Sequence, residues 1–276
     1  MITRRVFTLA VAAAAMSGCS RAGSNDDAFR WTQPMQPGAV VHILDGSGNV
    51  TVHRAAGNEV VVSGSTRWRR GRQSDIHFAV TRAGNDYYVC AMWRSSGRCG
   101  ARGYRGARSG GFLAMFSLFH RSSDAVANMV VAVPPGVAVD GQATNGSVDA
   151  DGVTGGIRAH TLNGNVRATN VSGPLSLKTM NGDVHLSTDS LAPSDSISVE
   201  TMNGGIFADL PATMQGAFDL RVTNGSVHSD FTPSGGSSTV TRGHLVAQIG
   251  SSSRVVRMHT MNGDVTVTAR GGPSSH

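Results

Sequence analysis

The sequence is poor in the residues that build bulky cores and helical surfaces. Aromatic residues make up 5% of the 276 residues, and Lys178 is the only lysine, so arginine carries almost all of the formal net charge of +6. Beyond the N-terminal segment, no window shows an apolar period of 3.6 residues over more than about three turns. These absences exclude a mainly helical fold. The chain has instead 35 glycines, which suit many tight turns and a thin core of small residues.

The N-terminal segment lacks a hydrophobic run long enough to cross a membrane as a helix. A pair of arginines precedes a short apolar run over residues 6–16, and small residues then lead to Cys19. This order is typical of an export signal. Cys19 ends the stretch MSGC, which resembles a bacterial lipoprotein box, so we expect residues 1–18 to be the signal and Cys19 to be lipidated. The stretch TRRVF also resembles the twin-arginine motif, and the sequence does not separate the two export routes.

Cysteine is scarce, with three residues in the whole chain. Export places them in an oxidising compartment, and lipidation of Cys19 would leave Cys90 and Cys99 as a pair. We therefore expect a local disulfide between Cys90 and Cys99. A metal site is excluded at this point, because no histidine or third cysteine lies nearby in the sequence.

The composition divides the rest of the chain into segments. Residues 19–37 are polar and end in prolines, which predicts a flexible tether. Residues 38–135 alternate short valine-rich runs with glycine, asparagine and aspartate, which predicts an N-terminal β region. Within it, residues 90–121 form an Arg/Gly-rich loop closed by the predicted disulfide. Residues 271–276 are expected to be a disordered tail.

The Arg/Gly-rich loop is the strongest candidate for a contact site. Its first part is too polar to bury much surface, and its second part is the apolar run FLAMFSLF. A basic and apolar element of this kind could contact an anionic membrane or partner, or the apolar run could simply pack on the end of the fold. The candidate contact residues are Arg94, Arg98, Arg102, Arg105 and Arg108.

Residues 136–270 repeat an Asn-Gly unit. Asn145, Asn163 and Asn181 are eighteen residues apart, and alignment on them brings apolar residues into columns, for example Val148, Val166 and Val184. Later units lengthen at one corner and recover the same register before their own Asn-Gly. Polar residues fall between the apolar columns, so the apolar columns are expected inside and the polar columns outside.

Two architectures fit this repeat. A single-stranded β-solenoid, or β-helix, would stack coils of about 18–22 residues so that each side chain packs on its own copy. An antiparallel β meander or sandwich would use each Asn-Gly as a hairpin turn. The residues one and two positions before Asn also recur, as in Thr179-Met180 and Thr201-Met202. A hairpin turn does not require these preceding residues to recur, whereas stacked coils do, because each side chain packs on its own copy in the next coil. The sequence therefore favours an all-β solenoid.

The stretch VAVPPG at residues 131–136, followed by repeated NG-x-V units, resembles the bacterial “putative adhesin” domain family. This is an envelope domain of unknown function related to the head domain of certain autotransporter-type adhesins. The resemblance covers most of residues 38–268 and is strongest over 131–206. It implies a β-solenoid-like fold, an export leader and no established enzymatic activity, and it transfers no catalytic or ligand-binding residue.

No catalytic, cofactor or metal site follows from the residues themselves. Glu200 is the only glutamate of the repeat region, and no G-x-S-x-G motif is present. His160 and His259 share one aligned column and His185 and His228 another, but each pair lies several coils apart, too far to hold one ion. Export also makes nucleic acid an implausible partner for the basic stretches.

The sequence therefore predicts a non-catalytic module, lipid-anchored in the cell envelope, that acts as an adhesin-like binding protein or scaffold. Its partners would be the membrane, through the anchor, and an anionic glycan, a lipid or another envelope protein. Ser20, rather than aspartate, follows Cys19 and favours the outer membrane or the periplasmic face. The alternatives are a glycan-acting solenoid enzyme and a structural or signalling periplasmic protein.

Overall fold

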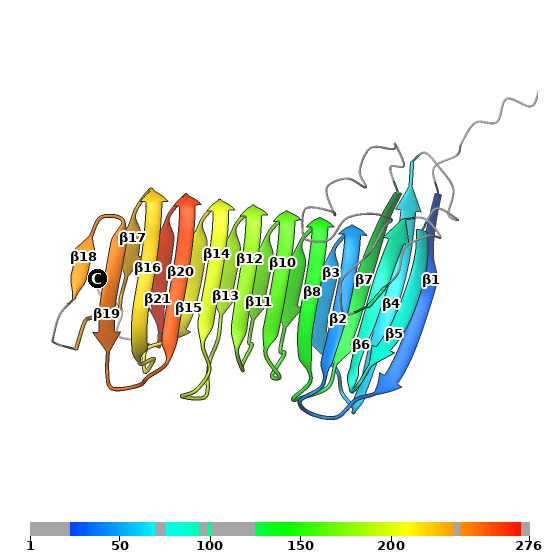
Figure 1. The fold of residues 1–276 in the computed structure, drawn as a ribbon, viewed down its shortest axis with the longest axis horizontal. Helices are drawn as coiled ribbons and strands as arrows, with labels where there is room; N and C mark the ends of the chain where they lie inside the picture. Colours follow the sequence, from blue (N-terminus) through cyan, green and yellow to red (C-terminus); the bar gives the residue numbers. More distant parts are fainter. Residues whose placement is uncertain (1–22, 70–75, 94–98, 101–124, 235–237, 272–276) are drawn as a thin grey trace, which may run out of the picture.

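The computed structural model describes residues 23–69, 76–93, 99–100, 125–234 and 238–271. These residues form two large β-sheets, and no helix occurs among them. The sheets face each other along an elongated molecule and share one apolar core (Figure 1). A search of the same residues for a helix of membrane-spanning length and hydrophobicity finds none.

Sheet A has ten strands and sheet B has eleven. Across sheet A the order is β1 (Gly23–Pro34), β4 (Glu59–Trp68), β7 (Ala125–Val133), β3 (Val50–Arg54), β9 (Val148–Asp151), β11 (Val166–Thr169), β13 (Val184–Ser187), β15 (Ile206–Pro211), β21 (Val265–Arg270) and β17 (Val227–Ser229). Across sheet B it is β18 (Thr239–Thr241), β19 (His244–Ile249), β16 (Gly216–Asn224), β20 (Val255–Asn262), β14 (Ile197–Asn203), β12 (Leu175–Asn181), β10 (Ile157–Asn163), β8 (Ala138–Asn145), β2 (Val40–Ser47), β6 (Asp86–Trp93) and β5 (Ile76–Ala83).

Strands in the middle of both sheets are parallel and keep the register of the repeat. In sheet A, Val166 pairs with Val148 on one side and Val184 on the other, as the sequence alignment predicted. All three side chains are 1% exposed or less. Arg167 and the residues that pair with it on β9 and β13 point outward. Apolar residues therefore alternate into the space between the sheets and polar residues face the solvent. The predicted inside and outside columns are confirmed.

Each Asn-Gly of the repeat lies at a corner where the chain passes from sheet B to sheet A. The strands before and after it, such as β10 and β11, belong to different sheets, so the Asn-Gly pairs of the repeat are not hairpin turns. The asparagine amides form a ladder from coil to coil: Asn163 Nδ2 donates to Asn145 Oδ1 at 2.8 Å, and Asn181 Nδ2 to Asn163 Oδ1 at 2.9 Å. The same bond continues through Asn203, Asn262 and Asn224.

The threonine two positions before asparagine is buried and joins one coil to the next. Thr179 Oγ1 donates to the carbonyl oxygen of Gly164 at 2.8 Å, and Thr161, Thr201 and Thr260 make equivalent bonds. Burying a hydroxyl is unfavourable unless it is hydrogen-bonded, and this bond satisfies the threonine at four of the corners, whereas Ala143 and Val222 occupy the same position before Asn145 and Asn224. The first coil has Asp45 at the aligned position, and burial raises the pKa of this carboxyl well above its ordinary value.

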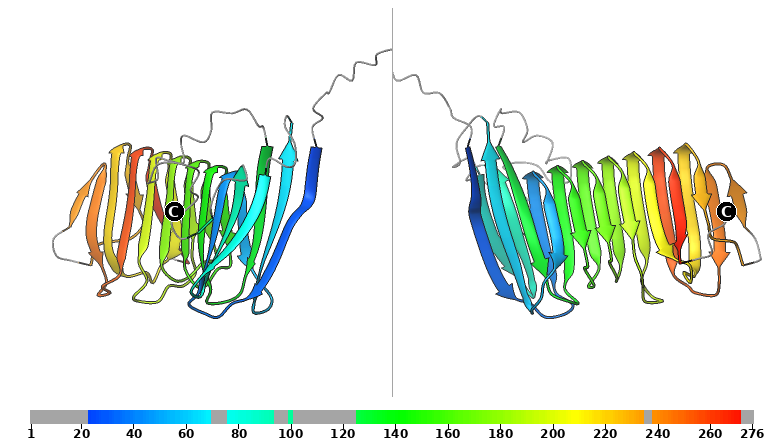
Figure 2. Two further views of the ribbon diagram at one scale, coloured as in Figure 1. Left: turned by 45° about the vertical axis from the view of Figure 1, so that its right-hand side comes forward. Right: turned by 180° about the vertical axis from the view of Figure 1, so that it is seen from behind.

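The last repeat unit does not stack on the end of the molecule. Strand β20 lies between β14 and β16 in sheet B, and β21 lies between β15 and β17 in sheet A (Figures 1 and 2). In a solenoid each coil is expected to stack on the one before it in the chain, and for this last unit that expectation is wrong. The free side of β16 is instead occupied by β19, which pairs with it antiparallel and carries β18 on its own far side. At this end of sheet B, the parallel strands are therefore followed by the antiparallel strand β19, which covers the edge of β16.

The opposite end holds a cluster of aromatic side chains. Phe29 of β1 stacks on Phe78 of β5 with ring centroids 4.9 Å apart, and Trp31 contacts Tyr87 at 5.0 Å. These contacts join sheet A to sheet B where the stack of coils ends. Residues 23–34, predicted as part of a flexible tether, instead form β1, because alternate side chains of this segment pack against the core while its backbone pairs with β4.

Candidate functional site

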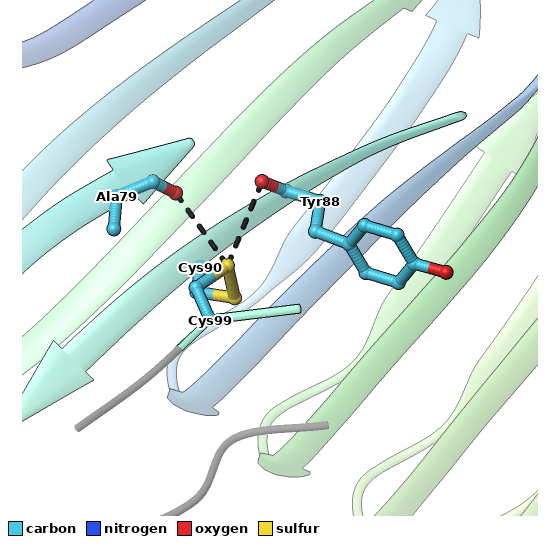
Figure 3. Close-up of a disulfide and its surroundings, with 4 residues drawn as sticks. All are labelled: Ala79, Tyr88, Cys90 and Cys99. Atoms are coloured by element: carbon cyan, nitrogen blue, oxygen red, sulfur yellow. Dashed lines mark hydrogen bonds between the residues drawn. A yellow bond between two sulfur atoms is a disulfide. The ribbon is translucent and has the colours of Figure 1, made fainter. Parts of the chain in front are cut away.

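The outward side chains of sheet B between β6 and β16, which we call the B face, include several hydrogen-bonded and ion-paired polar groups. The predicted disulfide lies at its β6 end (Figure 3). The Sγ atoms of Cys90 and Cys99 are bonded, and their Cα atoms are 5.9 Å apart. Cys99 Sγ also contacts the carbonyl oxygens of Tyr88 and Ala79 at 3.5 and 3.7 Å. A disulfide sulfur carries no hydrogen, so these are polar contacts and not donated hydrogen bonds.

The disulfide covers part of the B face. Leu44 and Met92 would otherwise point into solvent, but they are buried in a small apolar cluster with Cys90, and Cys99 packs against this cluster. The cross-link thus fixes Cys99 against β5 and β6. The predicted contact arginines, Arg94, Arg98, Arg102, Arg105 and Arg108, and the predicted lipidation site Cys19 lie outside the described residues.

A histidine and an aspartate far apart in the sequence meet beside the disulfide. His42 Nδ1 lies 2.8 Å from Asp140 Oδ2, because β2 and β8 pair in parallel and place the two residues side by side. Their side chains are 16% and 8% exposed. The His42 ring stacks on Tyr88 with centroids 4.1 Å apart, and Gln142 Nε2 donates to both carboxylate oxygens of Asp140 at 3.3 Å.

Burial and neighbouring carboxylates change the pKa of the tyrosine in this half-buried cluster. Burial raises the pKa of Tyr88, and the negative charges of Asp86 and Asp140 raise it further. The sequence search missed the cluster, since it considered histidines of the Asn-Gly units only. A signal was available, because Gly48-Asn49-Val50 aligns with Gly146-Ser147-Val148 and that alignment places His42 opposite Asp140.

Along the rest of the B face, carboxylates pair with cations on the same or the next strand. Glu200 accepts a hydrogen bond from Lys178 Nζ at 2.6 Å. Partial burial acts to raise the pKa of Asp219, but hydrogen bonds and charges from Arg221 and His244 hold it below its ordinary value. Arg257 Nε lies 3.8 Å from the same carboxylate. Burial lowers the pKa of His160, and the neighbouring Lys178 lowers it further.

The arrangement of charged groups on the B face suits the binding of a partner better than acid–base catalysis. General acid–base catalysis on glycans needs two carboxyl groups facing one substrate, whereas Glu200 and Asp219 lie on strands separated by β20, each engaged with its own cation. Among the described residues, no group of three or more histidine, cysteine, aspartate or glutamate side chains is placed to hold a metal ion. The histidines of the repeat stay apart, with His160 and His259 on sheet B and His185 and His228 on sheet A.

Comparison with known proteins adds a family match and several distant structures. A family model described as Toastrack DUF4097 matches residues 120–268. A “putative cell adhesion protein” from Clostridium sporogenes is 14% identical, with 88% of this chain and 99% of that chain covered and a TM-score of 0.44. A “putative adhesin” from Bacteroides fragilis is 9% identical, with 87% and 96% covered and a TM-score of 0.32. No curated protein shows significant similarity to the chain.

Proposed function

Because the chain belongs to the Toastrack DUF4097 family, we propose that it is a non-catalytic binding module of the cell envelope, anchored by lipid at Cys19. Its fold is a two-sheet β-solenoid that displays an adhesin-like binding surface. In-register parallel pairing of equivalent residues in successive coils supports the solenoid assignment. The lipoprotein-like leader of residues 1–18 supports export and anchoring.

The observation that carries the binding proposal is the disulfide on the B face. Cys90 and Cys99 bracket Arg94 and Arg98, and Cys99 is held against β5 and β6 by the cross-link and its carbonyl contacts. A polar segment held at both ends by a disulfide loses less conformational entropy on binding than a free one, and Arg102, Arg105 and Arg108 follow closely after the anchored Cys99. We propose that the arginines of residues 94–108 contact an anionic glycan or lipid of the envelope. A scaffold that binds another envelope protein through the same face is the alternative.

Replacing Arg102, Arg105 and Arg108 together with alanine should weaken binding to vesicles that contain an anionic phospholipid. Each arginine near an anionic surface contributes about 1 kcal/mol, so the triple variant should bind about 100-fold more weakly. Vesicle co-sedimentation at low and moderate salt measures this. The matched control replaces three exposed arginines away from the loop, Arg30, Arg54 and Arg242, which removes the same charge. Equal loss in both triple variants would show that net charge, and not the loop, is responsible.

Lipidation is tested separately. Cells expressing the full chain and fed an alkyne-labelled fatty acid should yield labelled protein that fractionates with membranes. The Cys19→Ala variant should lose the label and the membrane association, because lipidation takes place on that sulfur. Label that persists in Cys19→Ala would remove the anchor from the proposal and leave the B-face contact to be judged by the vesicle experiment.

A further inference from the structure

Three methionines occupy one position in three adjacent coils. Met180 lies beside Met202, and Met202 lies beside Met261, because the threonines and asparagines that flank them pair in register between β12, β14 and β20. Met202 and Met261 are 39% and 41% exposed. In chain order the third methionine is 59 residues beyond the second, so only the insertion of β20 beside β14 makes the row continuous.

These methionines differ from the others in the described residues. Met35, Met92, Met129, Met214 and Met258 are all buried. Leu162, which precedes Met180 in the same column on β10, is also buried at 3% exposure. The row therefore changes from an apolar packing position at β10 to a surface row of thioethers at β14 and β20. Exposed methionine does little for the core, whereas a thioether is a soft metal ligand that suits copper(I).

His259 adds a nitrogen ligand next to the two exposed sulfurs. It precedes Met261 by two residues on β20, so both side chains leave the same side of the sheet. The imidazole is exposed, and among the described residues it has no hydrogen bond or ion pair. Glu200, its neighbour on β14, is bonded to Lys178 instead. Among the described residues, the carboxylate beside His259 is therefore already neutralised by a lysine, which disfavours a hard cation such as calcium or magnesium.

The spacing of the coils fits a soft cation held between two sulfurs. Neighbouring strands are about 4.8 Å apart, and a linear sulfur–metal–sulfur unit spans about 4.6 Å, twice a metal–sulfur bond of about 2.3 Å. The long, unbranched methionine side chains can adjust the remaining difference, and His259 is within reach as a third ligand.

We propose that Met202, Met261 and His259 form a surface site for a soft monovalent cation of the copper(I) class. Met180 provides a second thioether on the far side of Met202. The site lies at the rim of sheet B, beside the asparagine ladder of the corner. It requires neither the lipid anchor nor the Arg-rich segment, so it is independent of the proposed binding function.

The test uses the full chain in a Cys19→Ser background, which removes the one cysteine outside the disulfide and leaves the disulfide intact. Silver(I), a redox-stable probe, is titrated and copper(I) is then competed against a chromophoric chelator without oxygen. We expect one cation per chain, with shifts of the Met202 and Met261 methyl resonances. The Met202→Leu/Met261→Leu variant keeps side-chain volume and should weaken binding at least about 100-fold, and His259→Gln about 10-fold.

The matched control is Met35→Leu, which removes a buried thioether and should leave the affinity unchanged. Thermal unfolding of each variant checks that the fold is retained, since leucine is accepted at this column by Leu162. Equal silver and copper(I) affinity in the parent and in Met202→Leu/Met261→Leu would overturn the proposal. So would methyl shifts confined to other methionines.

Discussion

Replacing Gly204 with alanine is expected to lower the free energy of unfolding by about 3–5 kcal/mol, far more than a surface substitution. Gly204 has φ of +150°, a region that side-chain-bearing residues rarely adopt. A Cβ at this position would lie 2.0 Å from the carbonyl oxygen of Gly182 in the preceding coil. Because the obstacle is backbone, relief requires the two coils to move apart. That movement would stretch the asparagine ladder between Asn203 and Asn181.

Urea unfolding followed by circular dichroism measures the effect, and the fitted midpoint and slope are compared with those of the parent. Gly57→Ala is the matched control, since Gly57 is an exposed turn glycine where a Cβ would meet nothing within 4 Å. This control should change the free energy of unfolding by less than about 0.5 kcal/mol. Equal stability of Gly204→Ala and Gly57→Ala would contradict the close stacking of the Asn-Gly corners.

A second large effect is expected from engineered cysteines that report the order of the coils. Arg257 of β20 pairs with Ser198 of β14 and also with Asp219 of β16. The variant Ser198→Cys/Arg257→Cys should therefore cross-link nearly completely on mild oxidation, because adjacent strands bring the Cα atoms within disulfide range. Peptide mapping under non-reducing conditions identifies the new bond and separates it from the native Cys90–Cys99 disulfide.

The control for this experiment is Ser198→Cys/Asp219→Cys. These positions lie on strands two steps apart, at about 9.6 Å, which exceeds the Cα separation that a disulfide can bridge. They would be adjacent if the units stacked in chain order. Cross-linking of Ser198→Cys/Asp219→Cys in place of Ser198→Cys/Arg257→Cys would show that the last coil is not inserted between β14 and β16.

The register of the repeat could be predicted from the sequence because it depends on local periodicity. Columns such as Val148, Val166 and Val184 follow from alignment on asparagine, and they are neighbours in the structure. The resemblance to the adhesin-like envelope family rested on the same residues, and the family match over 120–268 confirms it. The segments that carry Cys19 and the five contact arginines are outside the described residues, so lipidation and loop contact remain predictions.

The candidate site was only partly predictable. The disulfide followed from counting cysteines, and the structure contains it. The pairing of His42 with Asp140 was missed, because the two residues are 98 positions apart, the intervening chain forms strands β3 to β7, and the one short aligned stretch around Gly48 and Gly146 was not extended to them. Their meeting depends on the first coil, β2 and β3, pairing with β8 and β9 across that insertion.

By itself, the sequence determined what happens at each corner. The repeated Thr-Met-Asn-Gly fixes a buried threonine, a laddered asparagine and a glycine pressed against the neighbouring coil, since each has a local physical reason that every copy shares. The tertiary structure alone decided which coil lies beside which. Parallel coils with the same pattern can pair in more than one order with similar backbone bonds, so the choice depends on the ends. Strand β19 runs antiparallel along one edge of β16, which leaves only the other edge for β20.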